Sequence, residues 1–89
     1  MPLHYILAEK CAGKLVNVFC EVNPQHDSDD RPYYDAGPNS RFLENGATLK
    51  IKEVHAEYTN VNLLDSNGSN VGVGQIRSIY LKWAKIQDG

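Results

Sequence analysis

The most constraining feature of this 89-residue chain is a run of alternating apolar and polar residues with a strong turn signal in its second half. The turn signal is Asp65-Ser66-Asn67-Gly68, where asparagine and glycine readily adopt the positive φ angles of a tight reversal. The segments 47–54 and 58–65 precede it, and 69–76 follows it. Because the side chains of a β-strand point alternately to its two faces, this pattern predicts antiparallel strands that each bury one face.

The first part of the chain predicts two more strands, over 3–9 and 14–22, around a turn at Ala12-Gly13. In the second of these, apolar residues also occupy the opposite face, at Leu15 and Phe19. We therefore expect this strand to be covered on both faces. Its main buried side would carry Val16, Val18, Cys20 and Val22.

The two cysteines do not predict a disulfide. In the hairpin just described, Cys11 lies at the turn and Cys20 lies near the far end of the second strand. Their α-carbons would then be farther apart than the about 7 Å that a disulfide allows. Their spacing also matches no zinc-binding motif. We expect Cys20 to be buried and Cys11 to carry a partly exposed thiol.

The segment 23–40 differs from the rest of the chain. It contains three prolines, four aspartates and two tyrosines. Proline lacks an amide donor and fixes φ, so this composition predicts a long irregular loop. Loops of this length inside a small domain are either functional or surface decoration, and both interpretations stay open here. Tyr33 and Tyr34 lie between two prolines in polar surroundings, and we expect both to be exposed.

The C-terminal part allows two interpretations. A short 3₁₀ turn over 78–80 followed by a closing strand over 81–86 would continue the pattern of strands. A helix over 75–85 is the alternative, because Ile76, Ile79 and Trp83 recur at helical spacing. The strand interpretation is favoured by the hairpin that precedes it.

Size and composition limit the classes of protein. The length predicts one domain over residues 1–89, and 42% hydrophobic residues suffice for a small packed core. The net charge of −2 does not favour nucleic-acid binding by general attraction to phosphates. No apolar run approaches the roughly 18 residues that a membrane-spanning helix needs. The first residues lack the pattern of a secretion signal, so we expect a cytoplasmic protein.

The side chains predict no catalytic site. None of the three histidines lies in a recognisable nucleophile motif, and no phosphate-binding glycine loop is present. The acidic run 26–30 lacks the turn glycine and the closing glutamate of a calcium loop. We therefore expect a protein that is not an enzyme and that uses no cofactor or metal.

The order of motifs resembles that of Src-homology-three-like barrels over roughly residues 43–86. The resemblance implies an all-β fold, a small antiparallel barrel of five to seven strands, with the long loop 23–40 beside it. The motifs that carry it are Gly46-Ala47-Thr48-Leu49-Lys50-Ile51, Tyr58, the strand 61–63, Asn67-Gly68, and Gly74-Gln75-Ile76-Arg77-Ser78-Ile79-Tyr80-Leu81.

The same resemblance implies a binding groove. Proteins of this family dock proline-rich peptides across exposed aromatic side chains. Tyr58 stands where the family has its groove tryptophan, and Tyr80 where it has the groove tyrosine. Arg77 stands where a groove proline is usual. The long loop would wall the groove with Tyr33 and Tyr34.

We therefore expect an interaction module that binds a protein or peptide partner through this groove and through the acidic residues Asp27, Asp29 and Asp30. One alternative is a small accessory protein of a virus or mobile element that inhibits a host enzyme or builds a virion. Another is a nucleic-acid-binding barrel, although we do not expect nucleic acid as the partner. An edge strand at 3–9 could also pair with a second copy. The basic residues that the nucleic-acid alternative would use are Lys50, Lys52, Arg77, Lys82 and Lys85.

Overall fold

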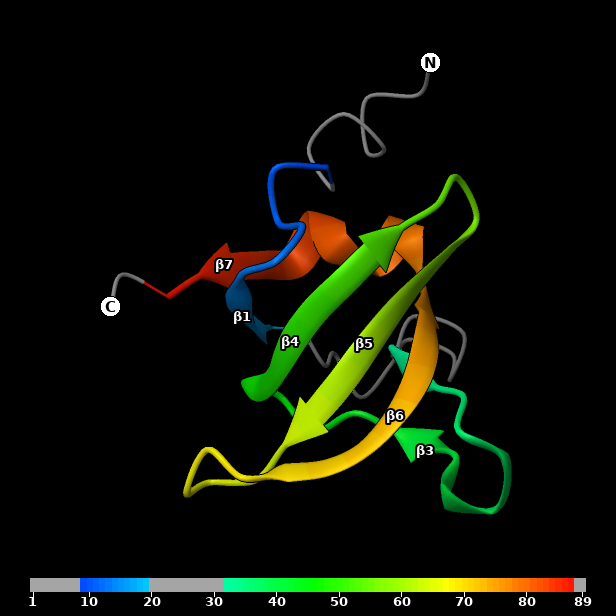
Figure 1. Ribbon diagram of the computed structural model, residues 1–89, viewed down its shortest axis with the longest axis vertical. Coiled ribbons are helices and arrows are strands. Elements are labelled where there is room, and N and C mark those ends of the chain that lie inside the picture. Colours follow the sequence, from blue (N-terminus) through cyan, green and yellow to red (C-terminus); the bar gives the residue numbers. More distant parts are fainter. Residues whose placement is uncertain (1–8, 20–31, 88–89) are drawn as a thin grey trace, which may run out of the picture.

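The computed structural model describes residues 9–19 and 32–87, and this part of the chain is built mainly of β-strands (Figure 1). The two helical elements with defined bounds are short 3₁₀ segments. The elements in chain order are β1 (Leu15–Val18), β2 (Tyr33–Tyr34), η2 (Gly37–Asn39), β3 (Arg41–Phe42), β4 (Ala47–Val54), β5 (Tyr58–Leu64), β6 (Asn70–Arg77), η3 (Ser78–Trp83) and β7 (Ala84–Ile86).

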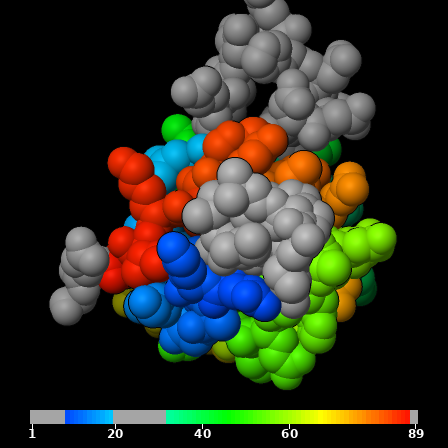
Figure 2. Space-filling model, turned by 90° about the horizontal axis from the view of Figure 1, so that it is seen from above, coloured from blue at the N-terminus to red at the C-terminus, as the bar shows by residue number. Residues whose placement is uncertain are grey.

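Five strands form one antiparallel sheet in the order β6-β5-β4-β1-β7, and β2 pairs with β3 in a separate hairpin. The two ends of the described chain lie near each other because β1 and β7 are neighbours in the sheet, as the blue and red atoms of Figure 2 illustrate. The prediction of a closed barrel is wrong for the described residues. η3 carries the chain away from β6, and the three-residue β7 pairs with β1 at the other end of the sheet.

The predicted central strands are confirmed almost to the residue. β4 has the predicted bounds, and β5 and β6 differ from them by one residue at their ends. The turn between β5 and β6 has the predicted chemistry, since one carboxylate oxygen of Asp65 accepts the amide protons of Asn67 and Ser69, both at 2.9 Å. Gly68 has a φ of +82°, which only glycine adopts without strain.

The core lies on one face of the sheet and is covered by η3 and by the β2–β3 hairpin. Leu15 and Phe19 are 37% and 44% exposed, so the prediction that the strand 14–22 is covered on both faces is wrong where it is described. No described element packs over its outer face. The most deeply buried residues of the sheet are Val16, Val18, Leu49, Ile51, Thr59, Val61 and Ile76.

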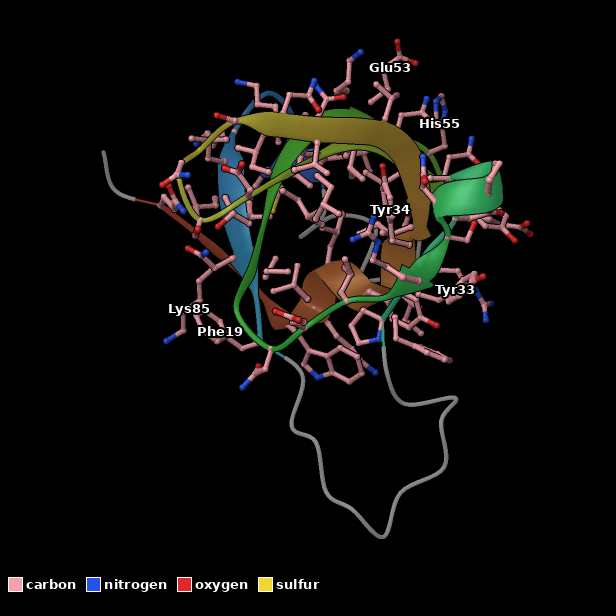
Figure 3. All side chains as sticks on the ribbon, turned by 90° about the horizontal axis from the view of Figure 1, so that it is seen from below. Phe19, Tyr33, Tyr34, Glu53, His55 and Lys85 are labelled. Atoms are coloured by element: carbon pink, nitrogen blue, oxygen red, sulfur yellow. The ribbon has the colours of Figure 1, made fainter. Side chains whose placement is uncertain are left out.

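Tyr34 is buried, with 1% of its surface exposed, whereas Tyr33 is exposed as predicted. Figure 3 shows Tyr34 pointing into the molecule and Tyr33 pointing away from it. The ring of Tyr34 lies against β6 at Gly72 and Gly74, and a Cβ atom on Gly74 would approach Tyr34 Cε2 to 2.5 Å. The predicted exposure of Tyr34 is therefore wrong, because two glycines leave room for its ring on the sheet.

The turn at Ala12-Gly13 is confirmed, since the amide of Lys14 donates to the carbonyl of Cys11 at 2.9 Å and Gly13 has a φ of +77°. Cys11 is 6% exposed, so the predicted partial exposure of its thiol is wrong. The turn brings this side chain into the core cluster. The rest of the predicted strand 3–9, Cys20, Val22 and the residues 23–31 lie outside the described residues.

The predicted 3₁₀ start at Ser78 is confirmed, and the helix over 75–85 is not found, since 75–77 belong to β6. The predicted bounds 78–80 and 81–86 are wrong, because the 3₁₀ segment continues to Trp83 and the closing strand begins only at Ala84. η3 starts at Ser78, which is fully buried. Its hydroxyl donates to the carbonyl of His55 at 2.6 Å and lies 2.7 Å from the hydroxyl of Thr59. Because Ser78 uses its only hydroxyl proton on His55, Thr59 is the donor in the second bond.

Replacing Gly74 by alanine should lower the free energy of unfolding by about 1–3 kcal/mol, as is usual for overpacking. The new Cβ would meet Tyr34 and also the carbonyl oxygen of Asp35 at 2.7 Å, which is fixed by its bond to Gln75. Urea unfolding measures the change. Gly72→Ala is the matched control and should cost less, because its Cβ would meet one atom, Tyr34 Oη, at 3.2 Å. Equal costs for the two variants would contradict this packing.

Ser78→Ala should lower the free energy of unfolding by about 1–3 kcal/mol, because it leaves the Thr59 hydroxyl and the His55 carbonyl without this partner. Thr59→Val should cost about 0.5–1.5 kcal/mol, because it removes one buried hydrogen bond while Ser78 still donates to His55. The double variant should cost less than the sum of the two, since the hydroxyls contact each other. Chemical denaturation of the four proteins completes the cycle. Strict additivity would show that the two hydroxyls do not interact.

Candidate functional site

The predicted groove residues Tyr58 and Arg77 lie side by side on the outer face of the sheet. They are register partners at the start of β5 and the end of β6. The neighbouring pair of Thr59 and Ile76 is fully buried, so the alternation of the strands turns Tyr58 and Arg77 outward. Tyr58 is 44% exposed. Ile79, which follows Arg77 by two residues in η3, is also exposed.

Tyr80 does not share this exposure. It is 9% exposed, and its ring stacks on Trp83 with a centroid distance of 6.0 Å and an interplanar angle of 10°. The Nζ atom of Lys82 lies 4.5 Å from the centre of the Trp83 ring. Tyr80 is therefore mainly a packing residue of η3.

The long loop contributes one exposed tyrosine rather than two. Tyr33 packs edge-on against Phe42, with a centroid distance of 5.2 Å, across the β2–β3 hairpin. Its partner in the sequence, Tyr34, belongs to the core. Of the five predicted groove residues, the structure thus exposes Tyr33, Tyr58 and Arg77, and pairs only the last two. Asp27, Asp29 and Asp30 lie outside the described residues.

The structure contains a cleft that the sequence did not reveal. It has a volume of about 460 Å³ and lies between the segment 41–48 and the turn that joins β5 to β6. Its apolar lining includes Phe42, Leu43, Leu63 and Val71, and its charged lining is Arg41, Glu44 and Asp65. Two separate parts of the chain form this cleft, so no local pattern could predict it. The one signal in the sequence is Val71, an apolar residue just after the turn that is half exposed and lines the cleft.

The backbone edge of β6 is also partly unpaired. Asp35 pairs with Gln75 through two backbone hydrogen bonds of 2.8 and 2.9 Å. The chain then turns away into η2, where Gly37 has a φ of +60°. Val73 lies two residues before Gln75 and is 62% exposed.

Two of the described residues have a shifted pKa, and in both cases burial is the main cause. Burial raises the pKa of the Cys11 thiol, with a smaller opposing effect from Lys14. Burial likewise raises the pKa of Tyr34, opposed in part by Arg41. Both groups are therefore neutral near pH 7 and are not activated as nucleophiles. Residues 9–19 and 32–87 contain no group of three histidine, cysteine, aspartate or glutamate side chains that could hold a metal ion.

Three of the basic residues considered for nucleic acid, Lys50, Arg77 and Lys85, share the outer face of the sheet according to their register. The Nζ atom of Lys50 donates a hydrogen bond to the carbonyl oxygen of Gly13 at 2.9 Å. Lys85 lies 5.8 Å from the ring centre of Phe19, and Figure 3 shows these two side chains next to each other. The basic residues are therefore spread over the sheet and do not form a continuous track.

Comparison with known proteins identifies no relative: no family model, no curated protein and no solved structure matches this chain. Among the described residues, no helix has the length and apolar character needed to cross a membrane.

Proposed function

We propose that this protein is a non-enzymatic interaction module that binds a segment of a partner protein, and that its order of strands and turns is that of Src-homology-three-like proteins, although its sheet stays open. The observation that carries the proposal is the exposed pair of Tyr58 and Arg77 at the junction of β5, β6 and η3. A large aromatic side chain left 44% exposed beside a cation is typical of an interface anchor.

The order of elements supports the architectural part of the proposal. Three long strands are joined by short turns, and a 3₁₀ segment then leads into a short closing strand, as the resemblance implies. Gly46 immediately precedes β4 and has a φ of +84°, and Gly68 lies in the turn between β5 and β6 with a φ of +82°. The motif glycines therefore occupy positions where the backbone requires them.

The side chains of the pair indicate the chemistry of the ligand. Tyr58 offers an apolar ring face with a hydroxyl at its end, which suits a proline or aliphatic side chain. Arg77 offers planar donors that suit a carboxylate or a backbone carbonyl. Because Tyr80 is buried, the contact surface is narrower than a groove built of several exposed aromatics. A short segment with one apolar anchor and one acidic or carbonyl group fits it.

Peptides selected on the immobilised protein from a phage-displayed random library should lose at least about tenfold in affinity when Tyr58 is replaced by alanine, since one anchor typically contributes that much. Fluorescence anisotropy with the synthetic peptides measures the loss. Tyr58→Phe keeps the ring and should stay within about threefold.

The melting temperature separates binding from folding in this test. It should change by only a few degrees in Tyr58→Ala, whose side chain is exposed, and fall markedly in Tyr80→Ala, whose side chain is buried and stacked. Peptides that bind the Tyr58→Ala variant as tightly as the original protein would contradict the proposed site.

The two alternatives, an accessory protein of a virus or mobile element and a nucleic-acid-binding barrel, stay predictions. No feature of residues 9–19 and 32–87 favours either of them over peptide binding.

A further inference from the structure

We propose that the edge of β6 around Val73 is a second binding surface, which takes an extended segment of a partner protein as an added antiparallel strand. The segment would also place one apolar side chain in the cleft of about 460 Å³ beside it. This surface is separate from Tyr58 and Arg77, and it does not depend on them.

The backbone N–H and C=O groups of every second residue of β6 point away from β5, toward the side where an added strand would pair. The N–H and C=O of Gln75 bond to Asp35, so they point away from β5. Residues two apart in a strand point their backbone groups to the same side, so Val73 directs its N–H and C=O away from β5 as well. Among the described residues no strand pairs with this side of β6, because the chain after Asp35 turns into η2. An incoming strand can therefore continue the ladder that Asp35 begins.

The edge also lacks the features that usually prevent such pairing. Native sheets protect their edges with charged side chains, prolines or covering elements. From Asn70 to Ile76 the strand has no charge and no proline, and Val71 and Val73 are 50% and 62% exposed. Exposed valines beside unpaired backbone groups are typical of surfaces that bind by strand addition.

The cleft supplies the specificity. A ligand residue opposite Gly72 would point its side chain to the inner side of the sheet, where Leu63 pairs with Gly72 and lines the cleft. The anchor side chain would thus meet the apolar walls that Phe42, Leu43 and Leu63 give the cleft.

The charges of the cleft and the direction of the added strand define the ligand further. A strand antiparallel to β6 runs toward the turn at 65–69. Glu44 and Asp65 line the cleft against the single cation Arg41. We therefore assign to the ligand an apolar residue followed, on the C-terminal side, by a lysine or arginine.

A second copy of this chain fits less well. Two β6 edges that pair symmetrically about Gly72 would place glycine opposite glycine, and neither copy would then fill the cleft of the other. The short pairing would also fall well below the about 1,000 Å² that a stable dimer usually buries. A peptide can both bond to the backbone of the β6 edge and place an apolar side chain in the cleft.

The test uses peptides selected on the wild-type protein from a phage-displayed random library and then synthesised with a fluorescent label. Val73→Pro removes the outward N–H and leaves the bonds to β5 intact, so affinity should fall at least about tenfold. Val73→Thr keeps the N–H and the branched side chain and should stay within about twofold. The selected peptides should share an apolar residue followed by a basic one.

A measurement on the unsubstituted protein guards against misfolding of the proline variant. When the peptide is bound, hydrogen exchange of the Val73 amide, followed by NMR, should slow by at least about tenfold, because the amide becomes hydrogen-bonded. The amide of Ile51 in β4, which donates to the carbonyl of Lys14, serves as an internal reference and should not change. An unchanged exchange rate at Val73 would overturn the inference.

Three other results would also overturn it. The first is a selection that yields no peptide. The second is a set of peptides that lose affinity in Tyr58→Ala and keep it in Val73→Pro, which would leave the proposed function standing without this surface. The third is concentration-dependent self-association that Val73→Pro abolishes, which would assign the edge to a second copy. Peptides sensitive to Val73→Pro and insensitive to Tyr58→Ala would support the edge, and they would contradict the aromatic site only if no selected peptide lost affinity in Tyr58→Ala.

Discussion

The contact of the Tyr34 ring with Gly72 and Gly74 is the interaction on which the rest of this structure depends. A buried tyrosine removes roughly 150–250 Å² from water, and here this surface is gained from a segment otherwise rich in aspartate and proline. The contact brings Asp35 to the edge of β6, where it forms its two backbone bonds with Gln75. It thereby fixes where the long loop returns to the sheet. Without a side chain at Gly74, the ring and the backbone can approach to within van der Waals distance.

The same contact determines which surfaces remain available for binding. Because the chain turns away after Asp35, the pairing along β6 stops at Gln75 and the stretch around Val73 remains open. The hairpin that Tyr34 anchors also forms one wall of the cleft, through Arg41, Phe42 and the residues that follow. On the outer face of the sheet, Arg77 stays exposed at the far end of β6, next to its register partner Tyr58 on β5. Both proposed surfaces thus share β6, and each uses a different side of it.

The features that could be predicted from the sequence are those set by residues close together in the chain. The bounds of β4 and the turn at 65–69 follow from alternation and from one carboxylate that accepts two amide protons, and both are properties of neighbouring residues. The start of the 3₁₀ segment at Ser78 could also be predicted, from the motif over residues 74–81. The burial of Tyr34 could not be predicted, because it depends on glycines almost forty residues away. The burial of Cys11, the open sheet and the cleft likewise depend on contacts between distant segments.

The packing of Tyr34 on β6 can be tested most directly by NMR of the unsubstituted protein. The ring current of an aromatic side chain shifts protons above its face upfield, so the α-protons of Gly74 should resonate well upfield of their usual position. They should also show cross-relaxation with the Tyr34 ring. Gly68, which has no atom within 4 Å of its Cβ position, should show neither effect and is the internal control. Ordinary shifts for Gly74, with no cross-peaks to Tyr34, would contradict the account.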